Sequence, residues 1–135
     1  MSQKKKKELF AVIKEMRSGA DFKIIPGDND EIMYQTAKEV MEGREYDFVF
    51  LYQLSYDYAQ HAHGPESAEA LAVLDRIIQR FEELYAVAEK SWQGNTLVMF
   101  HTDHGCHLEE DGHGHHGADI PEDTDIFHFW GGINK

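Results

Sequence analysis

The chain has 135 residues, which is the length of one domain with a single modest core and too short for two. Its 41% apolar and 28% charged residues predict a globular chain rather than a disordered one. The formal net charge of −12 disfavours nucleic acid and membrane surfaces as partners. The single cysteine, Cys106, excludes an intrachain disulfide. A lone cysteine suits a reducing compartment, and the sequence shows no signal peptide and no apolar run of membrane length. We therefore expect one cytoplasmic domain over residues 1–135.

The first third of the chain predicts two helices and two strands. An apolar spacing of three to four residues predicts an N-terminal helix within residues 1–20, and a short apolar run predicts a strand at 22–26. A second helix is expected to follow, with Asp28 or Asp30 as its N-cap. Residues 47–54 (DFVFLYQL) are continuously apolar, which is typical of a central parallel strand covered on both faces.

The remaining elements are one long helix and two further strands. Residues 65–90 carry one apolar stripe, which includes Leu71 and Ile78 and predicts a helix packed on a sheet. Apolar runs predict strands near 96–102 and 126–130. The alternation of helices and strands predicts a three-layer α/β fold with a mostly parallel sheet. In such a sheet, ligands bind beyond the carboxyl ends of the strands.

Carboxylates and imidazoles follow the predicted strands directly. Asp57 and His61 follow the strand at 47–54 and are four residues apart, so one helical turn or a tight loop can aim both at one ion. Asp103 and His104 follow the strand at 96–102, where a turn at Gly105 lets the pair converge or serve two neighbouring ions. These side chains suit a divalent metal of the zinc or manganese kind. We expect His107, by contrast, to lie in a solvated acidic loop.

Three motifs in order carry a resemblance to a known family: Asp-x-x-x-His-x-x-Gly-Pro at 57–65, Asp-His-Gly at 103–105, and His-Gly at 116–117 with Pro-Glu at 121–122. Together they resemble the alkaline phosphatase superfamily. The type I phosphodiesterase/nucleotide pyrophosphatase and ethanolamine phosphate transferase branches are the most similar. The resemblance runs from about residue 22 to 131. It implies a metal-dependent phosphoesterase or phosphotransferase that acts on a small-molecule phosphoester.

The resemblance also implies two metal positions, filled by zinc or alternatively manganese. The first takes Asp57, His61 and a late histidine, for which His116 keeps the family spacing best. His113 is the rival to His116, and His115 is a more distant third choice. This first position has three protein ligands in the present chain, so it is the one expected to be complete.

The second metal position is expected to be incomplete. It takes Asp103 and His104, while the family adds an aspartate and a nucleophilic threonine or serine from the N-terminal half of its core. No hydroxyl of residues 1–46 stands in a matching context, so no catalytic nucleophile is identified. We therefore expect a truncated, C-terminal half of the superfamily core. The nucleophile would then come from another polypeptide, from an upstream segment or from water activated by the metal.

Two other functions compete with an enzyme. The chain would be a non-catalytic metal-binding remnant, or an interaction module whose histidines merely solvate a loop. Half of a doubly wound core would also expose a sheet edge and apolar helix faces, which favour pairing. We therefore expect a homodimer, or association with the missing N-terminal half.

Overall fold

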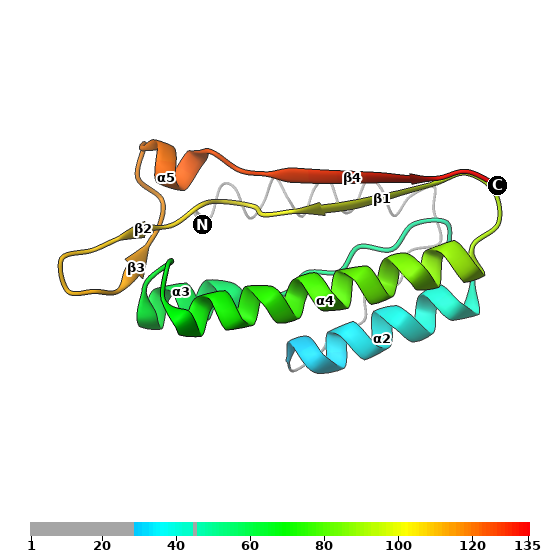
Figure 1. Cartoon of the computed structure of the whole chain (residues 1–135), viewed down its shortest axis with the longest axis horizontal. Coiled ribbons are helices and arrows are strands. Elements are labelled where there is room, and N and C mark those ends of the chain that lie inside the picture. The colour runs from blue at the N-terminus through cyan, green and yellow to red at the C-terminus, as the bar shows by residue number, and fades with distance from the viewer. Residues whose placement is uncertain (1–28, 45) are drawn as a thin grey trace, which may run out of the picture.

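The structure is a computed structural model that describes residues 29–44 and 46–135. The helix predicted within 1–20 and the strand predicted at 22–26 lie outside this part of the chain. The elements are α2 (Asp30–Gly43), α3 (Ser55–His63), α4 (Ala68–Ser91), β1 (Thr96–His101), β2 (His107–Leu108), β3 (Gly114–His115), α5 (Pro121–Thr124) and β4 (His128–Ile133). Figure 1 shows α2 and α4 running side by side along one side of the β1–β4 ribbon.

The N-cap of α2 is Asn29 rather than either predicted aspartate, and its side chain accepts an N–H of the first turn at 3.0 Å. Asp30 instead fixes the start of α3, because its carboxylate accepts the backbone N–H groups of Leu54 at 3.1 Å and Ser55 at 2.9 Å. Burial acts to raise the pKa of Asp30, but hydrogen bonds from Ser55 and Leu54 outweigh it and leave that pKa lowered. One carboxylate therefore ties α2 to the helix that carries Asp57.

The predicted long helix is confirmed as α4, which Ser67 caps by accepting the Ala70 N–H at 3.1 Å. The predicted apolar stripe is only partly buried, since Leu71 and Ile78 are exposed. Other residues of α4, among them Ile77, Leu84 and Val87, are buried, and α4 packs against both α2 and α3. The core cluster lies between α2, α4 and β4, and consists of Tyr34, Met41, Leu84, Val87, Ala88 and Ile133.

The prediction of a central strand at 47–54 is wrong. This segment connects α2 to α3 without joining a sheet, and only alternate side chains, Val49 and Leu51, pack against the core. Phe48 and Phe50 are exposed. An apolar run reports hydrophobicity, whereas a strand also needs a neighbour for its backbone hydrogen bonds, and none pairs with this segment in the described residues.

The two remaining predicted strands are confirmed as β1 and β4, the latter shifted toward the C-terminus. Their pairing is antiparallel, with Met99 opposite Trp130 and Phe100 opposite Phe129. The predicted parallel sheet is not what the described residues form, because the chain between β1 and β4 turns back without crossing to the start of β1. The described part is thus a mixed α/β arrangement of two layers, helices against ribbon, instead of three (Figure 1).

The short elements gather at one end of the molecule. The hairpin formed by β2 and β3 is antiparallel, with His107 opposite His115. It lies beside α3, with α5 nearby, at the end of the ribbon remote from the C-terminus (Figure 1). No helix in the described ranges is long and apolar enough to cross a membrane. The carboxyl end of β1 leads into this region, where the residues that follow the strand join the polar cluster.

Candidate metal centre

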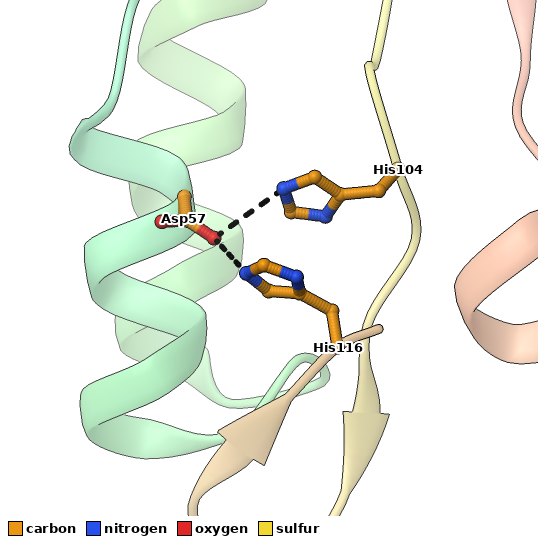
Figure 2. Close-up of side chains that lie close together, drawn as sticks. All are labelled: Asp57, His104 and His116. Carbon is orange, nitrogen blue, oxygen red and sulfur yellow. Dashed lines mark ion pairs between the residues drawn. The ribbon is translucent and has the colours of Figure 1, made fainter. Parts of the chain in front are cut away.

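Four of the predicted ligands meet between three separate segments. Asp57 and His61 lie one turn apart on α3, His104 lies in the loop after β1, and His116 directly follows β3. Figure 2 shows the His104 and His116 rings reaching from their two loops toward the carboxylate of Asp57. The predicted (i, i+4) arrangement of Asp57 and His61 is therefore present on a helix.

One carboxylate oxygen forms the middle of this cluster. Asp57 Oδ1 lies 3.4 Å from His61 Nε2, 3.8 Å from His104 Nε2 and 3.4 Å from His116 Nε2. Ligand atoms of Asp57, His104 and His116 all lie within 4.8 Å of one another. The oxygen is buried and has no hydrogen-bond partner. A buried polar atom without a partner costs free energy, so its presence here calls for a reason.

The backbone sets the tautomers of two of these histidines. Nδ1 of His61 lies 2.7 Å from the carbonyl oxygen of Gly114, and Nδ1 of His104 lies 2.9 Å from that of Gly105. A carbonyl oxygen only accepts, so each Nδ1 donates its proton. In the neutral ring, Nε2 then carries a lone pair, and both lone pairs face the carboxylate. A cation between these atoms relieves the repulsion, and such orienting backbone contacts are usual for metal-binding histidines.

His116 completes the ring of imidazoles. Its ring stacks on that of His104 with centroids 3.7 Å apart and planes 22° apart. The pKa of His116 is lowered from its usual 6.5. Burial is the largest cause, the neighbouring His104 lowers the pKa further, and Asp57 opposes the shift. Metal ligation requires neutral imidazole, so the surroundings of His116 favour its ligating form.

Asp103 stands at the margin of the cluster. Its Oδ1 lies 3.7 Å from His104 Nε2, and its Oδ2 accepts a hydrogen bond from the Tyr52 hydroxyl at 2.9 Å. Burial, together with this bond to the Asp103 carboxylate, raises the pKa of Tyr52 to about 12. Tyr52 stays protonated at neutral pH and orients the carboxylate. Sequence reasoning missed Tyr52, because it lies in the apolar segment predicted to be a strand.

The other late histidines point elsewhere. Nδ1 of His113 lies 3.0 Å from the backbone oxygen of His61, and its side chain is exposed. His115 is also exposed, and its Nδ1 accepts the His116 N–H at 2.7 Å. Of the three competing late histidines, the structure brings His116 beside Asp57. His107 is not in a solvated loop as predicted, since Nδ1 lies 2.8 Å from the buried carboxylate of Asp123.

Two glycines allow the segments to approach closely enough. A Cβ at Gly114 would lie 2.3 Å from the backbone oxygen of Gln60 on α3, and one at Gly105 would lie 2.0 Å from the backbone oxygen of Glu122. These distances are too short for any real side chain. Gly114 therefore seats β3 against α3, where its carbonyl meets His61, and Gly105 seats the His104 loop against α5.

A comparison with known families identifies the family of the chain. The sequence model of the family Type I phosphodiesterase / nucleotide pyrophosphatase matches residues 7–132, and the chain belongs to this family. The family is part of the alkaline phosphatase superfamily, as the three motifs predict. Neither the curated proteins nor the solved structures gave a match.

Proposed function

We propose that this domain holds a divalent cation between α3 and the two histidine loops and serves metal-dependent phosphoester hydrolysis or phosphoryl transfer. The observation that carries the proposal is Asp57 Oδ1, which is buried and has no hydrogen-bond partner. It faces Nε2 of His61 and of His104, and each of these rings carries its proton on Nδ1, which donates to a backbone carbonyl. Membership of a phosphodiesterase family supports the reaction class. The substrate is proposed to be a small-molecule phosphoester.

The donor set fits zinc, with manganese as the alternative. Imidazole nitrogen and carboxylate oxygen are usual zinc ligands, and a catalytic zinc site keeps three protein ligands and one open position. Asp57, His61 and His116 are proposed to form the more complete position. Asp103 and His104 are proposed to contribute to a second one, for which they supply only two ligands. A cation held there would polarise the phosphoryl oxygens and lower the pKa of the attacking hydroxyl or water.

The chain's own residues have separate parts in this proposal. His61 and His104 present fixed lone pairs, because their other ring nitrogens are held by backbone carbonyls. Tyr52 holds the Asp103 carboxylate through its hydroxyl. Since Asp57 and Asp103 are both acidic, a phosphate group would be repelled from the centre unless a cation neutralised it.

A non-catalytic metal-binding domain is the second candidate function. In the described part of the chain, no serine or threonine hydroxyl hydrogen-bonds to any of the five clustered side chains, Asp57, His61, Asp103, His104 and His116. A nucleophile from another polypeptide or an upstream segment is therefore proposed to complete the enzyme. Association as a homodimer or with such a segment remains part of the proposal.

Metal content and turnover separate the two candidates. Zinc titration of the chain by calorimetry should show about one tightly bound ion per chain, and this ion should be lost in His61→Ala. Hydrolysis of bis(nitrophenyl) phosphate by the chain alone should be slow or absent for want of a placed nucleophile. Slow turnover that disappears in both Asp103→Ala and His104→Ala supports the enzyme. Metal uptake without any turnover supports the binding domain, whereas robust turnover surviving both substitutions places the chemistry elsewhere.

A further inference from the structure

Asp123 is a buried carboxylate close to the metal centre that takes no part in it. It lies in the four-residue helix α5 and is 4% exposed. Asp123 belongs to none of the three family motifs, and the metal chemistry proposed above assigns it no role. Carboxylates are rarely this buried unless their oxygens are satisfied, so its partners show what it holds.

Its partners come from both loops that carry histidine ligands. Oδ1 of Asp123 lies 2.8 Å from His107 Nδ1, and Oδ2 accepts the Ala118 N–H at 2.8 Å. Its backbone oxygen accepts the Gly105 N–H at 2.9 Å. Gly105 directly follows His104, and Ala118 is two residues after His116. One residue therefore bonds to the chain beside each of the two histidines.

We propose that Asp123, together with His107, is a positioning residue that holds the His104 and His116 loops at the separation that the proposed metal centre needs. The inference rests on the proposed metal centre. The 3.7 Å between the two ring centroids is the separation that this tie would maintain. Two loops without such a tie would sample many separations, and metal affinity falls when ligands must first be ordered.

The tie acts on only half of the centre. Asp57 and His61 are placed by α3, which Asp30 caps and Gly114 contacts, with no bond to Asp123. Loss of Asp123 should therefore loosen His104 and His116 while leaving the α3 ligands in place. General destabilisation of the domain would instead disturb both halves together.

The test compares Asp123→Ala with Asp119→Ala. Asp119 is an exposed aspartate four residues away, so its substitution removes the same charge. Zinc affinity measured by calorimetry should fall about 10- to 100-fold in Asp123→Ala, the usual effect of losing a residue that orients metal ligands, and stay unchanged in Asp119→Ala. A second pair of variants, at His107, distinguishes loss of the tie from misfolding of Asp123→Ala. His107→Asn keeps a donor near the Nδ1 position and should retain affinity, whereas His107→Leu removes it and should lose affinity.

A metal-free measurement separates this inference from the proposed function. In nuclear magnetic resonance spectra of the apo protein, nuclear Overhauser effects between the His104 and His116 rings should be present in wild type and lost in Asp123→Ala. The contact between the side chains of His61 and Asp57, one turn apart on α3, should persist in both. If wild type binds no zinc, the metal centre fails, and these ring contacts still decide the role of Asp123. Unchanged zinc affinity and unchanged ring contacts in Asp123→Ala would overturn the inference.

Discussion

The end of the molecule that holds the histidine cluster differs from the β1–β4 ribbon in how its side chains are used. Around the cluster, each loop is held by specific hydrogen bonds, such as those of Asp30 and Asp123, and by glycines that permit close backbone contact. On the ribbon, large apolar side chains face outward instead. Leu97 is 59% exposed and Trp130 is 65% exposed.

The difference shows that this sequence specifies the site more fully than it covers the sheet. Exposed apolar side chains on neighbouring strands are uncommon in isolated domains and are typical of surfaces that pack against something else. The cluster, by contrast, is placed by contacts within the described residues, such as those of Asp30, Gly114 and Asp123. Substitutions at the two ends should therefore have different consequences.

Loss of one α3 histidine should abolish tight metal binding. His61→Ala removes a ligand, so zinc affinity should fall by more than the roughly 100-fold seen when only an orienting partner is lost. His63→Ala is the matched control, because His63 is an exposed histidine on the same helix. Calorimetric titration measures both. Equal affinities in the two variants would contradict the placement of His61 in the centre.

Crowding the contact between β3 and α3 should damage the site. Gly114→Ala places a methyl group 2.3 Å from the Gln60 backbone oxygen, so the segments must separate, at a cost of about 1–3 kcal/mol in the free energy of unfolding. Zinc affinity should fall too, since the Gly114 carbonyl orients His61. Gly132→Ala on β4 meets nothing within 4 Å and should be neutral or slightly stabilising. Denaturant unfolding checks the first effect, and a Gly114→Ala protein as stable as wild type would argue against this contact.

The His107–Asp123 pair should make stability depend on pH in a defined window. The hydrogen bond to Asp123 raises the pKa of His107 above 6.5, although burial opposes it, and so stabilisation is full below 6.5 and is lost as pH rises through the raised value. Burial acts to raise the pKa of Asp123, but the His107 and Ala118 hydrogen bonds leave it below 3.8. Its stabilisation is present above 3.8 and is lost as pH falls through the lowered value.

The melting temperatures of metal-free wild type and His107→Leu should therefore differ most between pH 3.8 and 6.5, the ordinary pKa values of the two groups. The difference should shrink at higher pH, as His107 loses its charge. Thermal unfolding followed by circular dichroism measures it. A difference that does not vary with pH would mean that the pair is not charged in the folded state.

Substitutions on the outer face of the ribbon should have the smallest effects. Leu97→Thr keeps strand propensity on an exposed position and should change the free energy of unfolding by no more than about 0.5 kcal/mol. Val98→Thr, one residue later, places a hydroxyl toward the core cluster and should cost about 1–3 kcal/mol. Chemical unfolding compares the two. Equal costs would show that the outer face is as well packed as the inner one.

The cluster was more predictable than the fold because its signal is local. Asp57 and His61 are one helical turn apart, and Asp103 and His104 are adjacent after an apolar strand, so short-range spacing suffices to place the members of each pair near one another. Choosing His116 over His113 required the family spacing, which the residues alone do not give. In the structure, the His116 ring lies beside Asp57, whereas His113 contacts the backbone oxygen of His61.

The errors share a physical cause in long-range pairing. Residues 47–54 are as apolar as a buried strand, yet strand formation depends on a neighbour that hydrophobicity does not reveal. The direction of β4 depends on how the chain between residues 102 and 127 turns back. His107 looked solvated because acidic residues surround it in sequence, and only the fold brings the Asp123 carboxylate to it.

The central claim is that the arrangement around Asp57 exists to hold a cation, and thermal unfolding of wild type and Asp57→Asn with and without zinc tests it most directly. Without metal, Asp57→Asn should unfold at a higher temperature, because an amide can donate to the imidazole lone pairs and the partnerless buried oxygen, which costs about 1–3 kcal/mol, is removed. With excess zinc the order should reverse, since binding stabilises only the protein that retains the ligand. Asp75→Asn, on an exposed site of α4, should follow wild type in both conditions. A wild-type melting temperature that zinc leaves unchanged, or one that rises equally in Asp57→Asn, would contradict the account.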